Sequence, residues 1–443
     1  GLFDVGNELE NVAFYGGDYG IYTTKASPGW PVMMVDSYFE GQRIAALRCQ
    51  ESGLAMVNLY AKNVPAVFDI DPNYCDKLFL ENSYFENVSG PAVVITNENN
   101  SNNQITFRNV YCKNVPVLAK YTRSNTDTKV AHKIYKVKSY DHGLQMDNLL
   151  DMPEYETLVE VEPIQKMPVA QRMDIPALPA MATWVNLREL GAKGDGETND
   201  TAAIQCAINA CPEGGRVYVP AGVYKIYPLF LKSDLVIELA KDSVLSAYTD
   251  RERFPILPGR IECQDPEKEY LLGTWEGDPN DMFAAIITGI NVENVVITGQ
   301  GTIDGNASRE NWWNNPKVRR IAWRPRMIFL NHCKNVVLHG ITVQNSPSWN
   351  IHPFFSEDLK FIGISVLGPK DSPNTDGLDP ESCKNVDIIG VYFSVGDDCI
   401  AVKSGKIYMG AKYKTPSEKI TIRQCCMRDG HGSITIGSEM AGG

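Results

Sequence analysis

The sequence predicts an all-β fold, a right-handed parallel β-helix (solenoid) that occurs as two tandem β-helix segments, both of which look truncated. Three observations predict it: short strand-like runs recur about every 20 to 30 residues, no helical period separates them, and Asn or another polar residue marks the turns. A single coil cannot bury its inner face, but coils stacked about 4.8 Å apart bury a continuous apolar column. A β-sandwich has a similar strand spacing and is the alternative fold.

The first repeat block covers residues 1–142, which we expect to form a partial β-helix. Its turns carry Asn-Val pairs at Asn63, Asn87 and Asn114, in steps of 24 and 27 residues. The runs between these turns are short and typical of strands. An Asn at each turn suits either a left-handed bend or a stacked ladder of side-chain hydrogen bonds.

Residues 143–183 interrupt the repeat. They contain five prolines, with Met and Glu between them. Proline punctuates regular structure, so we expect a linker or a strap packed along the edge of a solenoid.

The second repeat block covers residues 184–443 and begins with a predicted capping helix. Asn199 or Asp200 can cap the N-terminus of a helix over residues 202–211. The apolar face of this helix is formed by Ala203, Ile204, Ala207 and Ile208. A helix in this place is typical of a solenoid cap, because the first coil otherwise exposes its core.

Strand phrases then recur to the end of the chain. From Asn335 the polar turn residues follow in steps of 23, 27 and 34 residues, and the last step carries a loop insertion. These turn residues are Asn294, Asn335, Asp358, Asn385 and Lys419. The sequence thus predicts that the second β-helix continues through residue 443.

Composition limits the function classes. The 443 residues are 43% hydrophobic and 22% charged, as in soluble globular proteins, and no long uncharged apolar run predicts a membrane span. The formal net charge of −12 argues against nucleic acid and against anionic membrane surfaces as partners. A polyanionic substrate would need a local basic cleft.

The cysteines and the chain ends are less informative. Eleven scattered cysteines include no CxxC pair and no Cys/His spacing typical of zinc, so we expect buried thiols. One disulfide, from Cys399 to Cys425 or Cys426, stays open. The chain begins without the features of a signal peptide and both ends interrupt a repeat, so we interpret it as a fragment.

Candidate catalytic residues lie in the last coils, at Asp376, Asp397, Asp398 and His431. Asp376 and Asp397 are 21 residues apart, about one coil, so the three carboxylates can meet on one face. Like charges at close range separate their pKa values, and glycoside hydrolysis needs one protonated and one ionised carboxyl group. A solvated Asp-rich turn or a calcium site is the alternative. Flanking glycines are expected to let a bulky polymer approach: Gly377, Gly396, Gly430 and Gly432.

Residues 184–443 resemble glycoside hydrolase family 28, the polygalacturonases and their relatives. The ordered motifs that carry the resemblance are Gly-Asp-Gly-Glu-Thr-Asn-Asp-Thr from Gly194, Gly-Gln-Gly-Thr-Ile-Asp-Gly from Gly299, Arg-Pro-Arg from Arg324, Ser-Pro-Ser-Trp-Asn-Ile-His-Pro from Ser346, and the motifs around the four catalytic candidates. The family is a β-helix that cleaves pectin, so the resemblance implies hydrolysis of polygalacturonan or oligogalacturonides.

The resemblance implies roles for these residues. Asp397 is the general acid, Asp376 and Asp398 hold and deprotonate a water, and His431 tunes the acid or contacts the substrate. The anomeric configuration is inverted, with carboxyl groups roughly 6.5–9.5 Å apart, and no metal or cofactor is needed. Asn374, His352 and Lys403 are the expected substrate-binding groups, since a lysine can pair a uronate.

Some features stay open in this family reading. Arg324 and Arg326 are expected to be structural. The family's later Arg-x-Lys motif does not occur before residue 443. Endo or exo action and the oligomeric state are open, although the phrases around Lys403 and Glu439 resemble bacterial members, often exo-acting. Secretion or periplasmic export is expected, and a cytoplasmic location stays possible.

Residues 1–142 resemble the broad pectate-lyase-like β-helix superfamily. Tyr19, Trp30 and Tyr38 are candidates for stacking on sugars, with coil-edge or core positions as the commoner use of such rings. The acid pairs Asp36 with Glu40 and Asp69 with Asp71 are expected to be solvated turn acids. The alternative functions are a hydrolase of rhamnogalacturonan or another uronate polymer, a polysaccharide lyase, and a non-catalytic carbohydrate-binding β-helix.

Overall fold

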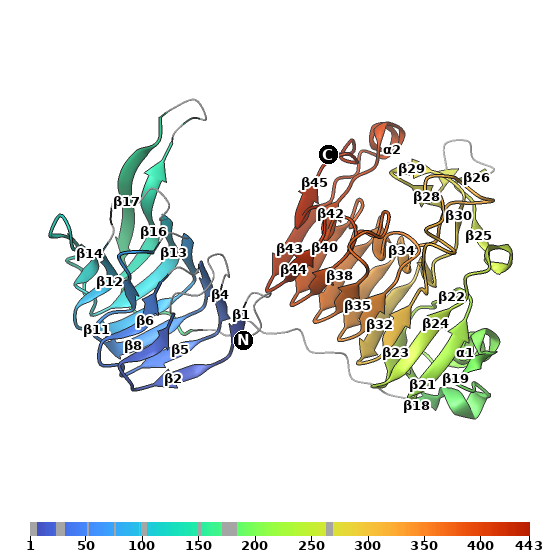
Figure 1. The fold of residues 1–443 in the computed structure, drawn as a ribbon, viewed down its shortest axis with the longest axis horizontal. Coiled ribbons are helices and arrows are strands. Elements are labelled where there is room, and N and C mark those ends of the chain that lie inside the picture. The colour runs from blue at the N-terminus through green and yellow to red at the C-terminus, as the bar shows by residue number, and fades with distance from the viewer. Residues whose placement is uncertain are drawn as a thin grey trace. The chain divides into compact units, whose positions relative to one another are not determined.

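The computed structural model describes residues 7–23, 32–50, 53–74, 77–96, 98, 104–146, 148, 152–170, 184–262 and 269–443. The chain divides into two compact units, unit 1 (residues 1–176) and unit 2 (residues 177–443). Figure 1 shows that each is built from stacked strands that run in parallel from coil to coil. Among the described residues, no helix is both long enough and apolar enough to cross a membrane.

Unit 1 is a parallel β-helix with two strand-bearing walls joined by turns. The first wall holds, in order, β1 (Asn7–Glu10), β4 (Val32–Val35), β7 (Leu54–Val57), β10 (Lys77–Glu81), β13 (Gln104–Lys113), β11 (Tyr84–Val88), β8 (Tyr60–Val64), β5 (Tyr38–Glu40) and β2 (Ala13–Tyr15). The second holds β3 (Tyr19–Tyr22), β6 (Ala45–Cys49), β9 (Phe68–Ile70), β12 (Pro91–Ile95), β14 (Val117–Tyr121) and β15 (Thr126–Lys129). The start of β13 pairs with β10 and its end with β11, so this long strand joins the two halves of the first wall into one sheet.

Unit 1 ends in antiparallel strands. β16 (Ile134–Gln145) pairs antiparallel with β13, and β17 (Glu154–Pro163) pairs antiparallel with β16. Residues 154–163, within the predicted linker or strap, therefore form a strand that pairs along the edge of unit 1. The alternation of Val and Glu in this segment is typical of a strand. Pro153 and Pro163 lie at the two ends of the strand, where the missing backbone N–H interrupts the fewest inter-strand hydrogen bonds. The predicted domain boundaries themselves stay predictions.

The Asn residues at the turns adopt the left-handed bend and also form the side-chain hydrogen-bond ladder, the two structures expected from the sequence. Asn63, Asn87 and Asn114 have φ values of 55°, 54° and 55°, in the left-handed region. The Asn87 amide donates to Asn63 at 3.0 Å and that of Asn114 to Asn87 at 2.6 Å. In unit 2, Asn335 donates in the same way to Asn294 at 2.8 Å. Each Asn therefore sets a bend and ties it to the next coil.

Unit 2 is a longer β-helix with three parallel sheets. The first holds β18 (Trp184–Asn186), β20 (Gly215–Val219), β23 (Leu235–Leu239), β32 (Glu293–Gly299), β35 (Lys334–His339), β38 (Glu357–Ile362), β40 (Lys384–Ile389) and β43 (Glu418–Arg423). The second holds β19 (Asp195–Asn199), β21 (Gly222–Ile226), β24 (Ser243–Ala247), β33 (Thr302–Asp304), β36 (Thr342–Gln344), β39 (Ser365–Leu367), β41 (Tyr392–Ser394) and β44 (Cys426–Asp429). The third holds β22 (Leu229–Phe230), β31 (Ile287–Ile290), β34 (Ile328–Asn331) and β37 (Ile351–Phe354), and the pair β42 (Ile400–Val402) and β45 (Ile434–Ile436) follows.

Unit 2 also contains shorter elements. They are β25 (Ile256–Leu257), β26 (Ile261–Glu262), β27 (Glu269–Tyr270), β28 (Thr274–Trp275), β29 (Asp278–Pro279), β30 (Met282–Phe283), the helix α2 (Ile407–Tyr413) and the 3-10 turns Leu187–Leu190 and Arg251–Arg253. The apolar side chains of the coils form one continuous core. The predicted all-β parallel β-helix is confirmed, and the sandwich alternative is wrong because the strands pair in parallel with the next coil.

The capping helix is confirmed within one residue. Helix α1 spans Thr201–Ala210 and buries Ile204, Ala207 and Ile208. Asp200 occupies the N-cap position without a side-chain capping hydrogen bond, and Asn199, just before it, accepts a hydrogen bond from the Thr201 N–H at 3.1 Å. Asp200 instead accepts from the backbone N–H groups of Lys193 and Gly194 at 2.7 and 2.9 Å, fixing the preceding loop.

No disulfide joins the described cysteines. Cys399 is buried and Cys425 and Cys426 are half-buried, so the disulfide that the sequence left open does not form here. Cys206, on helix α1, is exposed, unlike the buried position expected for most thiols.

Candidate active site

The three candidate aspartates lie where the second sheet of unit 2 turns into the third. Asp376 follows β39 and precedes Leu378, which bridges to β37 on one side and to β42 on the other. Asp397 and Asp398 occupy the next coil, between β41 and β42. The coil repeat thus stacks the two turns.

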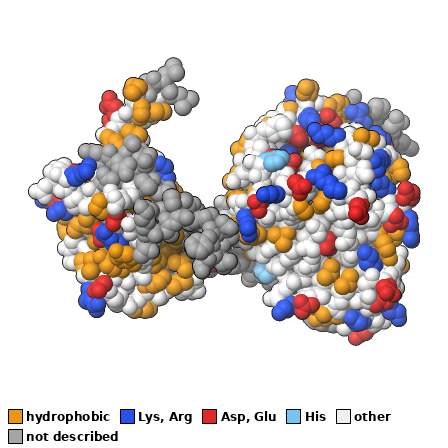
Figure 2. Space-filling view, in the orientation of Figure 1, with side chains coloured by type: hydrophobic (Ala, Val, Ile, Leu, Met, Phe, Trp, Pro, Cys, Tyr) orange, Lys and Arg blue, Asp and Glu red, His pale blue; other side chains and the backbone are white. Residues whose placement is uncertain are grey.

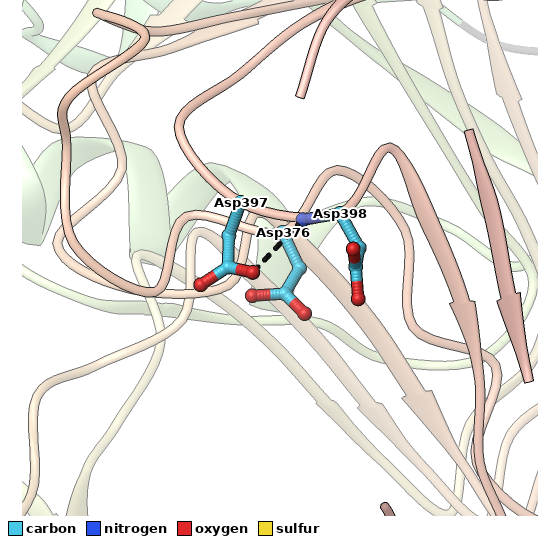
Figure 3. Close-up of side chains that lie close together, drawn as sticks. All are labelled: Asp376, Asp397 and Asp398. Carbon is cyan, nitrogen blue, oxygen red and sulfur yellow. Dashed lines mark hydrogen bonds between the residues drawn. The ribbon is translucent and has the colours of Figure 1, made fainter. Parts of the chain in front are cut away.

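The structure brings the three carboxyl groups together, as Figure 3 shows. One oxygen from each of Asp376, Asp397 and Asp398 lies within 4.8 Å of the other two. Asp376 is 4% exposed, whereas Asp397 and Asp398 are half-buried. The Asp398 N–H donates to Asp397 Oδ1 at 3.1 Å, which fixes that carboxylate. The nearest oxygens are closer than the 6.5–9.5 Å expected between the carboxyl groups of an inverting pair.

The flanking glycines serve packing more than substrate access. A Cβ on Gly377 would lie 2.4 Å from the carbonyl oxygen of Cys399, and one on Gly396 would lie 2.2 Å from that of Ser372. Both contacts are with backbone, which cannot move aside cheaply. The glycines therefore let adjacent turns approach, and the expectation that they make room for a polymer is wrong for these two.

His431 lies beside the proposed acid. Its Nδ1 is 3.2 Å from Asp397 Oδ1, and its backbone N–H donates to the Asp397 carbonyl at 2.9 Å. The imidazole side chain is 70% exposed. His431 can therefore contact both Asp397 and a ligand in solvent, in agreement with either role expected from the sequence.

Lys403 does not lie where a substrate could touch it. The residue is 4% exposed, and its Nζ is 3.4 Å from Asp379, 3.6 Å from Glu439 and 3.8 Å from Asp376. The expectation that Lys403 binds a uronate is corrected: its ammonium group is surrounded by carboxylates of the protein itself.

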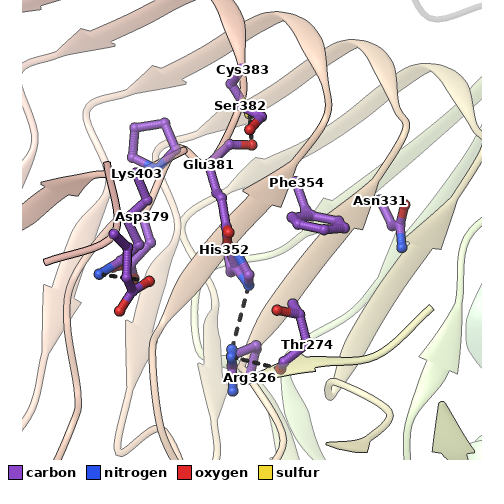
Figure 4. A network of polar contacts seen from close by, with 12 residues as sticks. Thr274, Arg326, Asn331, His352, Phe354, Asp379, Glu381, Ser382, Cys383 and Lys403 are labelled. Carbon is purple, nitrogen blue, oxygen red and sulfur yellow. Dashed lines mark hydrogen bonds and ion pairs between the residues drawn. The ribbon is translucent and has the colours of Figure 1, made fainter. Parts of the chain in front are cut away.

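His352 is also buried, with 0% exposure, and lies in the network of Figure 4. Arg326 Nε donates to His352 Nδ1 at 3.4 Å. This contact assigns the proton of the neutral ring to Nε2, which donates to Glu381 at 2.8 Å. Burial, then the positive charges of Arg326 and Lys403, hold the pKa of His352 well below its usual range. The expected substrate contact is therefore corrected to a structural link.

Asn374 is held by an arginine that the sequence reading had set aside as structural. Arg324 Nη2 donates to Asn374 Oδ1 at 2.7 Å, and Nη1 donates to the carbonyls of Pro347 and Pro373 at 2.7 and 2.9 Å. Arg324 thus ties down the turn that leads into Asp376. Asn374 is half-buried, so its expected contact with substrate stays a prediction.

Electrostatics separate Asp376 from the other two aspartates. Burial raises the pKa of Asp376 to about 7, Lys403 opposes this, and the charge of Asp397 adds to it. Burial also raises the pKa of Asp379 well above its usual range. A carboxyl group with a raised pKa is a stronger base when ionised. The three oxygens can also ligate a cation, because hard cations prefer carboxylates.

Sequence reasoning missed the acids behind the site. Asp379, Glu381 and Glu439 are 0%, 0% and 4% exposed and face the core of the turn region. Asp379 and Glu381 are two residues apart, a spacing which indicates that their side chains share one face of an extended segment. The sequence did not reveal that this face points inward.

Similarity to known proteins agrees with this geometry. Residues 267–443 match the model of Glycosyl hydrolases family 28. Unit 2 resembles glycosyl hydrolases family 28. Residues 184–236 match a second model, Rhamnogalacturonase A/epimerase, pectate lyase-like. The predicted resemblance of residues 184–443 to family 28 is confirmed. The pectate-lyase-like match lies at the start of unit 2, and the same likeness for residues 1–142 stays a prediction.

Individual relatives carry related names. A probable polygalacturonase of Vitis vinifera is 34% identical over 283 residues, 62% of this chain and 55% of that protein. An endo-polygalacturonase of Pectobacterium carotovorum subsp. carotovorum is 32% identical over 265 residues, 56% of this chain and 60% of that protein. The structure of an exopolygalacturonase from Thermotoga maritima is 28% identical, with a TM-score of 0.50, over 60% of this chain and 65% of that one. The chain thus spans between 55% and 65% of the length of these three relatives.

Proposed function

We propose that unit 2 hydrolyses α-glycosidic bonds of pectin, in polygalacturonan or oligogalacturonides, with inversion of the anomeric carbon. The observation that carries this proposal is the cluster of three carboxyl groups in unequal surroundings. Asp376 is buried with a raised pKa, and Asp397 and Asp398 open toward solvent within 4.8 Å of it. Unequal carboxyl groups at one place are what acid–base cleavage of a glycoside requires.

The proposed roles follow from exposure and neighbours. Asp397 donates a proton to the leaving glycosidic oxygen, and His431, 3.2 Å from it, supports this donation. Asp376 and Asp398 hold a water between them, and Asp376 accepts its proton as the water attacks the anomeric carbon. The raised pKa of Asp376 favours this acceptance, because a base is most effective when its pKa is near the working pH.

Inversion needs its own test, because the carboxyl oxygens lie closer than in most inverting enzymes. Three carboxyl groups support inversion in another way: two can hold the water while the third protonates the oxygen. NMR of the first product formed from a reduced-end-labelled galacturonan would identify the anomer. A β-anomer released from an α-linkage supports inversion, and an α-anomer means that an aspartate acts as a nucleophile.

The activity itself is tested with polygalacturonate and defined galacturonan oligomers. New reducing ends are measured beside ultraviolet absorbance, for the wild type, Asp397→Asn and the matched control Asp387→Asn on β40. New reducing ends without absorbance, lost only in Asp397→Asn, support the hydrolase. Growing absorbance means an unsaturated product and a lyase. Monomer as the sole early product identifies exo action, which the mixed endo and exo names of the relatives leave open.

A hydrolase of rhamnogalacturonan is the second candidate. The match of residues 184–236 to a model named for rhamnogalacturonase A favours it. On the visible face of unit 2, acidic and basic side chains lie interspersed (Figure 2), which suits a substrate whose uronates alternate with neutral sugars. Cleavage of rhamnogalacturonan oligomers with no action on polygalacturonate would select this candidate.

A further inference from the structure

Lys403 is a cation enclosed by the protein's own acids. It follows β42, and its side chain is 5% exposed. Its Nζ contacts Asp379, Glu439 and Asp376 at 3.4, 3.6 and 3.8 Å. Lysine is almost never buried unless it is paired, so these contacts define what the residue does. The three acidic residues lie 24 to 36 residues from Lys403 along the chain, and Lys403 therefore joins three coils.

An aromatic stack holds the ammonium group in place. Nζ lies 4.4 Å from the centre of the Trp349 ring, and Arg326 lies 4.2 Å from the centre of the same ring. Arg326 is in turn 4.8 Å from the ring of Trp275. Cation–π contacts of this kind strengthen when they are desolvated. The position of Lys403 is thus set from the aromatic side as well as from the carboxylates.

We propose that Lys403 is a positioning residue, which holds the Asp376 carboxylate ionised and oriented for proton removal from the attacking water and does not bind the substrate. This inference rests on the proposed function. Asp376 is otherwise buried, and one of its oxygens accepts no hydrogen bond within the described residues. A buried carboxylate without a counter-charge would take up a proton and could not act as a base.

The charges around Lys403 agree with this role. Burial works to lower the pKa of Lys403, but Asp379, Asp376 and Glu439 more than offset it, so the pKa lies above its ordinary value. Lys403 therefore stays charged at all working pH values. For Asp376, burial raises the pKa most, and Lys403 is the largest opposing influence. Glu381 is a further acid that acts on this ammonium, and the neutral His352 is close enough to be affected by the charges of both Lys403 and Arg326.

The two possible roles of Lys403 predict different kinetics. Removing a group that lowers the pKa of Asp376 raises that pKa, so the acidic limb of the profile of kcat/KM against pH moves to higher pH. For an opposite charge within about 4–6 Å the shift is about one to three units. Removing a uronate-binding lysine would instead raise KM about tenfold or more and leave the limb in place.

The first experiment compares Lys403→Met with the matched variant Lys406→Met. Lys406 lies three residues away and contacts Glu276 at 3.2 Å, outside the cluster. We expect Lys403→Met to move the acidic limb up by one unit or more, with KM within about threefold, and Lys403→Arg to restore the limb. Lys406→Met should leave it unchanged. A raised KM with an unmoved limb would overturn the proposal.

A second measurement needs no turnover and separates the inference from the proposed function. The stability difference between the wild type and Asp376→Asn, measured by thermal unfolding across pH, reports the pH at which Asp376 titrates. The same comparison is made in a Lys403→Gln background, because glutamine keeps a polar side chain at this position if Lys403→Met does not fold. In that background the pH at which Asp376 titrates should rise by one unit or more. An unchanged titration overturns the role of Lys403. A shifted titration in a protein inactive on every galacturonan supports it and rejects the proposed reaction.

Discussion

The two β-helical units share a backbone plan but use buried charge differently. In unit 1, Arg48 contacts Asp69 and Asp71 at 2.5 and 2.7 Å, so one cation is divided between two acids near the surface. In unit 2, Lys403 is divided among three acids, and neither oxygen of Asp379 accepts a hydrogen bond within the described residues. Buried charge without full compensation is costly and gathers at functional sites. The comparison shows that the coil pattern specifies the fold, while uncompensated acids mark the site.

The polar candidates of unit 1 support its own structure. Asp36 accepts a hydrogen bond from the Asn58 amide at 2.5 Å, and Glu40 accepts one from the Tyr38 hydroxyl at 2.7 Å. The ring of Tyr38 lies 5.4 Å from that of Tyr60, as part of a column along the coils. Trp30 lies outside the described residues. Sugar binding by unit 1 stays a prediction.

The largest expected effect separates the acids of the two units. Asp376→Asn should lower kcat by about 10²- to 10⁴-fold, because it removes the proposed base. Asp69→Asn in unit 1 makes the same chemical change in an acid that contacts Arg48 and should leave kcat within about twofold. Both are measured as reducing ends released from polygalacturonate, with circular dichroism to verify folding. Equal losses in the two variants would mean that the acids of unit 1 take part in the reaction.

Much of the fold could be predicted from the sequence, because it depends on local pattern. The turn residues Asn87 and Asn335 and the helix α1 were found from spacing and capping signals alone. The places of Lys403 and His352 could not be predicted, because charged and polar residues normally face solvent. Only partners from other coils make their burial possible, and sequence spacing does not show which way those partners point.

Stability of unit 2 should depend on pH through its buried acids. Burial raises the pKa of Glu381 and of Glu439 to about 7, so the folded state binds more protons than the unfolded state between about pH 4 and 7. The free energy of unfolding should therefore fall as pH rises through this window, by on the order of 1 kcal/mol or more for each group. Calorimetry between pH 5 and pH 8 measures the fall.

Variants distinguish this effect from a general loss of stability. Glu381→Gln replaces the acid by an uncharged amide that does not titrate. This variant should show a smaller fall in the free energy of unfolding between pH 5 and pH 8. Glu98→Gln is the matched change in unit 1, where the buried carboxylate accepts hydrogen bonds from the N–H and hydroxyl of Ser124. It gives the general stability cost of replacing a buried Glu by Gln, against which the effect of Glu381→Gln is compared. A wild-type stability that rises from pH 5 to pH 8 would contradict the burial argument.

The Asn ladders should contribute equally in both units. Asn114→Ala and Asn335→Ala each remove one ladder hydrogen bond. Each also puts alanine, which cannot hydrogen-bond locally through its side chain, at a left-handed φ of 55° or 52°. Each should cost about 1–2 kcal/mol, of which Gly at the same position recovers part. Urea unfolding measures both. A cost for one variant only would show that the repeat is uneven between the units.

The smallest expected effect concerns metal ions. The oxygens of Asp376, Asp397 and Asp398 are close enough to hold a cation, and a polysaccharide lyase would need one. Lys403, however, already places a positive charge 3.8 Å from Asp376, and two cations that close in a buried place repel strongly. A chelator such as EDTA should therefore leave the release of reducing ends unchanged, and added calcium should not raise it.

Activity that is lost to the chelator and restored by calcium, with unsaturated products, would replace the acid–base mechanism by elimination. Activity lost without unsaturated products would instead mean that a cation holds and polarises the attacking water, which would contradict the expectation that the reaction needs no metal.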